Sequence, residues 1–158
     1  MTERLDDEIF GKDQPCYGCS PTHPHGFRLK FERDEGSVTA RYTPTELVQG
    51  PPGLMHGGLV IALADEIAAW TIIGMKERLA FTAAVDARLR GPVRIGVEVV
   101  ARGHITQDGG RVIKVDVELR QEGVHVFQGA FKFALLDRTG AERVLGRELP
   151  EAWKRFCR

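Results

Sequence analysis

Residues 54–75 are apolar or glycine at nearly every position, and Asp65 and Glu66, near the middle of this stretch, are its only charges. A buried carboxylate costs several kcal/mol unless it is compensated, so acids are rarely retained in such a stretch without a partner or a task. A helix that is apolar on all sides has to be covered on most of them. The rest of the chain must therefore supply a surface that wraps this segment.

The same stretch is long enough to cross a membrane. Two adjacent acids at its centre would cost roughly 2.5–3.5 kcal/mol each even on a lenient insertion scale. The stretch also has no aromatic belt and no flanking basic cluster. We therefore expect a helix buried inside a soluble fold.

Glycine and proline indicate where this helix begins and ends. Residues 49–53 read Gln-Gly-Pro-Pro-Gly, which suits neither a helix nor a central strand, so they are expected to form a loop. His56-Gly57-Gly58 opens the apolar run, and Gly74 lies near its end. The pattern predicts a helix from residue 57 or 58 to about residue 75. The glycine pair can leave backbone N–H groups free at a helix start, where anions bind well.

Alternation of apolar and polar residues predicts strands on both sides of the helix. Two are expected before it, at about residues 27–31 and 37–42. Four are expected after it, at about residues 81–89, 96–107, 111–121 and 124–136. A single helix with such a full apolar surface needs a sheet that curls around it. The predicted fold class is therefore α+β, a curved antiparallel sheet of about six strands wrapped around one long central helix.

The chain of 158 residues is expected to form one domain, residues 1–158. Residues 1–25 are expected to be an irregular arm, and residues 138–158 a tail with a short helix. Basic and acidic residues balance at 22 each, which argues against a nucleic-acid partner or an anionic membrane. The N-terminus lacks the basic and apolar regions of a secretion signal, so a cytoplasmic location is expected.

The cysteines raise the question of a metal. Cys16 and Cys19 form a Cys-x-x-Cys pair followed by His23 and His25, and these are ligands that zinc accepts. Structural zinc sites usually draw their ligand pairs from separated segments, whereas these four residues share one short arm. The favoured interpretation is a turn-rich arm with reduced thiols, without a metal or a cofactor.

The spacing of Gly57 and Asp65 constrains how they could act together. Eight residues of helix span about 12 Å at about 1.5 Å per residue. An oxyanion donor at Gly57 and a carboxylate at Asp65 of the same helix cannot both reach one carbonyl. If both act, the spacing requires two antiparallel helices meeting across a two-fold axis. Glu66 points about 100° away from Asp65, so it is interpreted as a structural or pocket residue.

Residues 50–66, Gly-Pro-Pro-Gly-Leu-Met-His-Gly-Gly-Leu-Val-Ile-Ala-Leu-Ala-Asp-Glu, resemble the signature of the hotdog-fold thioesterases of the phenylacetate-degradation type. The N-terminal Cys-Tyr-Gly-Cys-Ser at residues 16–20 is similar to an element of one branch of that family. The resemblance covers about residues 16–137. It implies an acyl-CoA hydrolase in which the helix carries the active site and the sheet wraps it.

The resemblance also implies roles for individual residues. The Gly57 backbone N–H would polarise the thioester carbonyl, and Asp65 of the other subunit would attack it or activate a water. His56 would fix the loop or touch the thioester, and Thr82 would orient the water or the carboxylate. The predicted catalytic residues are thus Asp65, Gly57, His56 and Thr82.

Further residues are expected to bind substrate. Gly50 stands where the family often has an asparagine or glutamine, which leaves Gln49 as the nearby candidate to assist the carbonyl. Arg88 and Arg90 could meet the phosphates of coenzyme A, although a solvated basic face is an equal alternative. The predicted substrate-binding residues are Gln49, Met55, Gly58, Arg88 and Arg90.

Two other functions remain open on the sequence. One is an acyl-CoA-binding module without turnover, and the other is an acyl-thioester hydratase or dehydratase of the same fold. The expected partners are the acyl-CoA substrate and a second copy of the chain in a homodimer with shared sites. Dimers could pair further into a homotetramer. The acyl group cannot be inferred from the sequence.

Overall fold

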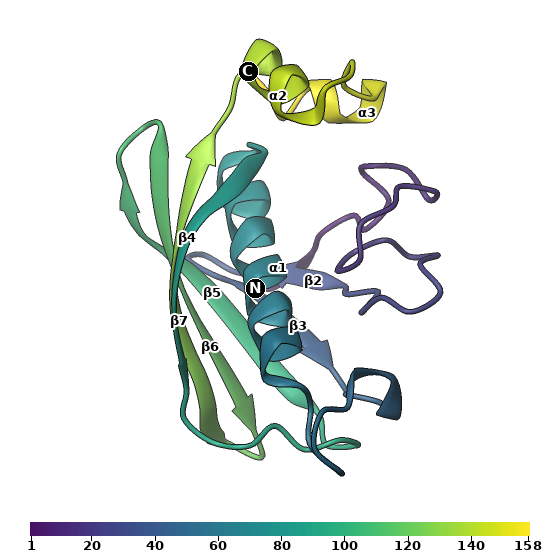
Figure 1. Ribbon diagram of the computed structural model, residues 1–158. Coiled ribbons are helices and arrows are strands. Elements are labelled where there is room, and N and C mark those ends of the chain that lie inside the picture. The colour runs from purple at the N-terminus through teal and green to yellow at the C-terminus, as the bar shows by residue number, and fades with distance from the viewer.

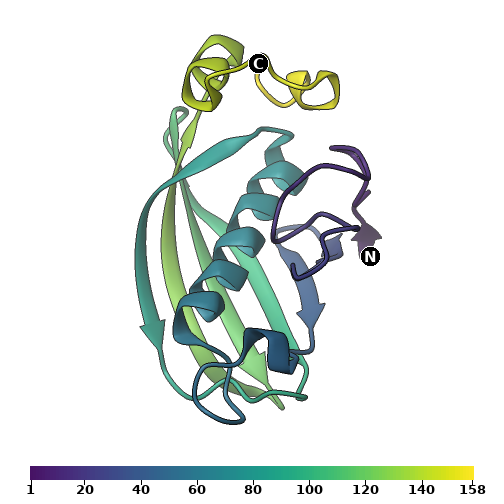
Figure 2. The same cartoon turned by 45° about the vertical axis from the view of Figure 1, so that its right-hand side comes forward.

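The computed structural model describes residues 1–158 and contains one antiparallel sheet, one long helix, a short 3-10 helix and two short C-terminal helices. The sheet order is β1-β2-β3-β5-β6-β7-β4, with all neighbours antiparallel. Figures 1 and 2 show the sheet curving around α1. The elements are β1 (Glu3–Arg4), β2 (Phe31–Arg33), β3 (Val38–Tyr42), η1 (Glu46–Val48), α1 (Gly57–Lys76), β4 (Ala80–Leu89), β5 (Val99–Asp108), β6 (Val112–Gln121), β7 (Val124–Leu135), α2 (Arg138–Leu145) and α3 (Glu151–Lys154).

This architecture confirms the predicted fold class. The six expected strands correspond to β2–β7, and the seventh, β1, is two residues long. Helix α1 begins at Gly57 and ends one residue beyond the predicted end, where Glu77 adopts a left-handed conformation and its N–H bonds to the Ile73 carbonyl. By length and composition α1 could also cross a membrane, a test that core helices of soluble proteins pass as well.

The core lies between α1 and the concave face of the sheet. Leu63, Ile67 and Trp70 of α1 are fully buried, and they belong to the same cluster as Phe127 and Phe131 of β7. Alternation along β6 and β7 places one face of each strand in this core and the other in water. The rigid pairing of β5, β6 and β7 thus provides the surface on which α1 is held.

One glycine permits the closest approach of α1 to the sheet. A Cβ added to Gly103 of β5 would overlap with the hydroxyl of Thr71 on α1 and lie 3.2 Å from Ile67 Cγ2. The Thr71 hydroxyl is itself fixed, because it donates a 2.8 Å hydrogen bond to the Ile67 carbonyl. The depth at which α1 sits in the sheet therefore depends on the absence of a side chain at residue 103.

The expected strand at residues 27–31 was wrong in position. Only Phe31 of that stretch lies in β2, and Arg28 has a positive φ of 50°. Phe27 and Leu29 are buried, as their alternation predicted, but their N–H groups bond to the carbonyls of Tyr17 and Gly18 in the N-terminal arm. Alternation of apolar and polar residues indicates which side chains are buried, but it does not indicate which backbone groups form the hydrogen bonds.

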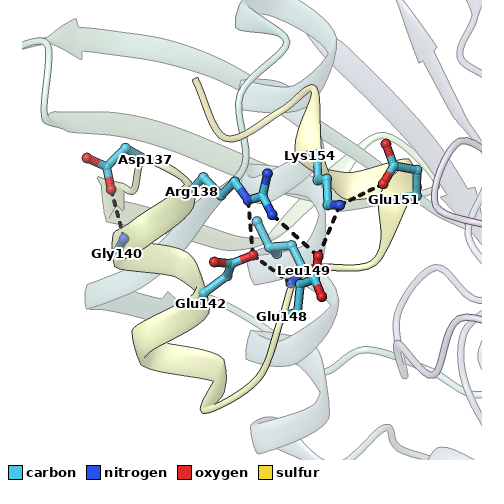
Figure 3. Close-up of polar contacts among 8 residues, drawn as sticks. All are labelled: Asp137, Arg138, Gly140, Glu142, Glu148, Leu149, Glu151 and Lys154. Atoms are coloured by element: carbon cyan, nitrogen blue, oxygen red, sulfur yellow. Dashed lines mark hydrogen bonds and ion pairs between the residues drawn. The ribbon is translucent and has the colours of Figure 1, made fainter.

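The C-terminal tail contains α2 in addition to the expected short helix. Figure 3 shows the polar contacts that join α2 and α3. Asp137 caps α2 by accepting from the Gly140 N–H at 2.8 Å. Arg138 bonds to Glu142 at 3.1 Å, and Lys154 reaches Glu148 at 3.2 Å. These pairs are largely exposed, so each contributes little stability. They set the relative position of α2 and α3.

Candidate active site

Asp65 and Thr82 meet at the open edge of the sheet. Asp65 lies in the middle of α1 and is half-buried, and Thr82 lies near the start of β4. The Thr82 hydroxyl donates a 2.7 Å hydrogen bond to Asp65 Oδ1. A β-bulge between Thr82 and Ala84 shifts the pairing of β4 with β7 at this point. Bulges of this kind redirect a side chain, and they are common beside active sites.

The environment of Asp65 favours its protonated form. Burial raises the pKa of the Asp65 carboxyl above its ordinary value, and the hydrogen bond from Thr82 partly opposes this shift. A carboxylate with a raised pKa is a stronger base than an ordinary surface aspartate. It is therefore suited to accept a proton from a water molecule.

The beginning of α1 presents one unused hydrogen-bond donor. His56 caps the helix, with its Nδ1 accepting from the Gly58 N–H at 3.0 Å, while the next two N–H groups bond to the His56 carbonyl. The Gly57 N–H makes no hydrogen bond within the chain. Because helix N-termini carry partial positive charge, this free donor suits an oxygen that becomes negative.

The loop before α1 is held in place by backbone contacts. The His56 N–H bonds to the Val48 carbonyl at 2.9 Å. The Gln49 carboxamide oxygen accepts from the Gly53 N–H at 2.7 Å, which leaves its amide group free to donate outward. Met55 is only 4% exposed and belongs to the hydrophobic core, so in this chain its side chain anchors the loop to the core.

An apolar strip of β4 joins the two ends of the site. Val85 and Leu89 pair with the core residues Phe131 and Phe127 of β7, so their side chains point toward the α1 side of the sheet. They remain 41% and 49% exposed because β4 has no neighbour on its outer side. A Cβ placed on Gly57 would lie 3.2 Å from Leu89 Cδ2. The strip thus runs from Thr82 to the start of α1.

The two predicted phosphate-binding arginines lie elsewhere. Arg88 pairs with Gln128, whose side chain is on the solvent face of β7, and Arg90 donates to the Gln128 side chain at 2.9 Å. Both arginines line a surface depression on the convex face together with Asp86. Within one chain the structure brings together Asp65 with Thr82, and Gly57 with His56 and Gly58. It does not bring Arg88 or Arg90 to either group.

Sequence reasoning did not assemble a second polar cluster on the other side of Asp65. Glu66 reaches Cys16 and Cys19 of the N-terminal arm, with its carboxylate oxygens 3.6 and 3.7 Å from Cys16 Sγ. Burial and the nearby Cys16 raise the pKa of Glu66 to about 8. Hydrogen bonds with Cys19 are the largest cause that lowers the pKa of Cys16 to about 6, while the pKa of Cys19 is raised.

The comparison with protein families decides the assignment of the chain. Residues 52–128 match the model of the thioesterase superfamily. The chain is similar to the thioesterase superfamily over about half of its length. The matched region runs from the loop before α1 to the middle of β7 and so includes His56, Gly57, Asp65 and Thr82. The family resemblance inferred from residues 50–66 is thereby confirmed.

Solved structures, among them proteins named as thioesterases, share the fold of this chain. A hypothetical thioesterase of Streptococcus pneumoniae TIGR4, crystallised with coenzyme A, superposes with a TM-score of 0.63 at 17% identity, over 68% of this chain and 87% of that one. A Streptococcus mutans UA159 protein bound to acetyl-CoA gives a TM-score of 0.63 at 19% identity, over 68% and 87%. A phenylacetic acid degradation-related protein of Ralstonia eutropha JMP134 gives 0.63 at 20% identity, over 68% and 85%.

A curated relative matches over a shorter region. The methylthioribose-1-phosphate isomerase of Aquifex aeolicus (strain VF5) is 28% identical over 79 residues, which is 50% of this chain. The chain spans only 17% of the length of that protein. The match is therefore a likeness to one segment of a much longer chain.

Proposed function

We propose that this protein acts as a thioesterase and hydrolyses acyl-CoA thioesters at a site shared by two subunits. The observation that carries the proposal is that one helix holds two groups: a Gly57 N–H without a hydrogen-bond partner, and an Asp65 carboxylate that is bound by Thr82. Gly57 and Asp65 lie about 12 Å apart along α1, so one substrate carbonyl cannot contact both groups of the same helix. Two antiparallel copies of α1 would place Asp65 of one subunit beside Gly57 of the partner subunit, twice per dimer.

The chemistry follows from the two groups. The Gly57 N–H would donate a hydrogen bond to the thioester oxygen and stabilise the negative charge that develops on it. Asp65 would take a proton from a water molecule whose oxygen attacks the carbonyl carbon. Collapse of the tetrahedral intermediate breaks the C–S bond, and the coenzyme A thiolate leaves and takes up the proton that Asp65 removed from the water. Direct attack by Asp65 on the carbonyl is the alternative first step.

The open edge of the sheet supports a dimer. Strand β4 is ten residues long and unpaired on its outer side, and its strip of Val85 and Leu89 is exposed. Long, apolar edge strands are rarely left uncovered. A second copy of β4 would continue the sheet and bring the two α1 helices side by side. Association of two dimers into a tetramer remains a prediction.

The substrate class rests on the family and on its structural neighbours. Two of the neighbours were crystallised with coenzyme A or acetyl-CoA. An acyl-CoA bound at the shared site would extend its nucleotide over the surface of the dimer. There, Arg88 and Arg90 of either subunit are candidates to pair with its phosphates.

The test is release of free thiol from acetyl-, medium-chain, long-chain and phenylacetyl-CoA. We expect turnover of at least one of these substrates, and a loss of about 100-fold or more in Asp65→Asn. Asp6→Asn is the matched control, because Asp6 is an exposed residue of the N-terminal arm whose carboxylate accepts from the Glu8 N–H and bonds to no residue of the site. Tight acyl-CoA binding without thiol release would instead indicate a binding module. A change in enoyl absorbance without free thiol would indicate a hydratase or dehydratase.

A further inference from the structure

Cys16, Cys19 and Glu66 converge from two distant segments of the chain. The cysteines lie in the N-terminal arm, which packs beside α1 (Figure 2), and Glu66 projects from the middle of that helix. One ligand atom of each residue lies within 4.8 Å of the others. The objection raised by the sequence, that all ligands would come from one short arm, no longer applies, because α1 supplies the third.

The separation of Cys16 and Glu66 matches that of two ligands in a tetrahedral zinc site. Zinc binds thiolate sulfur at about 2.3 Å and carboxylate oxygen at about 2.0–2.2 Å, so tetrahedral angles place such a sulfur and oxygen about 3.5 Å apart. Cys16 Sγ lies 3.6 Å from one Glu66 oxygen and 3.7 Å from the other. The Cys16 sulfur and the Glu66 carboxylate therefore already stand at the spacing that a shared ion requires.

The surroundings of Glu66 provide no cation for it. No lysine, arginine or histidine forms an ion pair with this carboxylate, although two thiols lie against it. Three acidic groups thus share a partly buried position with no compensating charge. A divalent cation would supply that charge.

Outer contacts orient the three groups as they do in metal sites. Trp70 Nε1 donates a 3.1 Å hydrogen bond to Glu66 Oε1. Gln14 holds the cysteine turn, because its Oε1 accepts from the Cys16 N–H at 2.7 Å and its Nε2 donates to Cys19 Sγ at 3.5 Å. Ligands held by such donors keep the orientation that a bound ion requires.

Gly18 lets the cysteine turn sit directly on Glu66. A Cβ added at residue 18 would overlap with the Glu66 carboxylate. The turn is anchored from the other side, where the Leu29 N–H bonds to the Gly18 carbonyl at 3.0 Å. A side chain at residue 18 would therefore separate the thiols from the carboxylate without removing any ligand.

We propose that Cys16, Cys19 and Glu66 bind one zinc ion that joins the N-terminal arm to α1, with a water molecule in the fourth position. His23 is not a ligand, because its ring packs against Tyr17 with the ring centroids 5.2 Å apart and lies outside the cluster. The site is separate from the hydrolysis proposed above and does not depend on it. It connects the arm to the residue that follows Asp65.

The first experiment measures zinc per chain in the full-length protein, reduced, treated with chelator and then supplied with zinc chloride before desalting. We expect one zinc per chain in the wild type and in the control Cys157→Ser, whose thiol lies in a separate small cluster with Ala141 and Leu149. Cys16→Ser and Cys19→Ser should lose the ion. Gly18→Ala should also lose it, whereas Gly36→Ala, at an open position, should keep it.

Cobalt substitution tests the ligand set in folded protein. The wild type should show a thiolate-to-cobalt charge-transfer band that Glu66→Gln keeps at lower affinity and that Cys16→Ser weakens. His23→Ala should leave the band unchanged. A wild type that retains no zinc, or that loses its two thiols to a disulfide under reducing conditions, would overturn the proposal. Equal zinc loss in Gly18→Ala and Gly36→Ala would also contradict it, and circular dichroism identifies any variant that has not folded.

Discussion

The hydroxyl of Thr82 donates a 2.7 Å hydrogen bond to the carboxylate of Asp65, and it does so from the outermost strand of the sheet. Seventeen residues separate the two in sequence. The bond fixes the half-buried acid beside the unpaired edge strand β4. It opposes the effect of burial, which raises the pKa of the Asp65 carboxyl.

Replacing Thr82 tests whether this bond positions the acid. Thr82→Val should lower kcat about tenfold with little change in KM, because a hydrogen bond to a charged group contributes about 1.5–3 kcal/mol. Thr82→Ser keeps the hydroxyl and should restore most of the rate. Steady-state kinetics of thiol release measure both. Equal losses in the serine and valine variants would assign Thr82 a packing role only.

A mixing experiment tests the shared site. Gly57→Pro removes the free N–H, and the change is compatible with the first position of a helix and with the extended conformation of His56. Asp65→Asn removes the acid. Each variant alone should be inactive. Co-refolding them in equal amounts should restore about a quarter of the wild-type activity, because about half of the dimers are then mixed and each mixed dimer contains one intact site of its two.

The outcome of that mixture separates two arrangements. If both groups acted within one subunit, every chain in the mixture would carry a defect and no activity would return. Mixing each variant with itself gives the background rate. Size-exclusion chromatography before the assay confirms that both variants still associate.

A charge on the open strand should separate the subunits. Val85→Lys places an ammonium group on the exposed strip of β4, where a second copy of the strand would have to bury it. We expect a monomer in analytical ultracentrifugation and a loss of thiol release in proportion to the lost dimer. Val144→Lys, on the exposed surface of α2, should change neither. A fully dimeric Val85→Lys would mean that β4 is not the interface.

A change in the core tests how α1 is seated. Gly103→Ala should lower the free energy of unfolding by about 1–3 kcal/mol, because the added methyl group overlaps with Thr71. Adding Thr71→Ala should recover part of the loss, and urea denaturation of the two single variants and the double variant gives the coupling energy. Strict additivity would show that the two residues do not contact each other.

Local patterns in the sequence determined much of this structure. The apolar run with a glycine pair at its start determined α1, because a helix of that composition has to be enclosed. Alternation with glycine turns determined β5, β6 and β7. The same patterns identified Gly57 and Asp65 as candidates, since a carboxylate inside an apolar helix is costly.

Only the tertiary structure decided which side chains meet. Thr82 and Arg88 would share a face in a regular strand, but the bulge at residues 82–84 reverses the alternation and places them on opposite faces. Glu66 and Cys16 are fifty residues apart, and they meet because the arm folds back against α1. Local sequence fixes what each segment prefers to form, whereas register and long-range packing fix which groups come together.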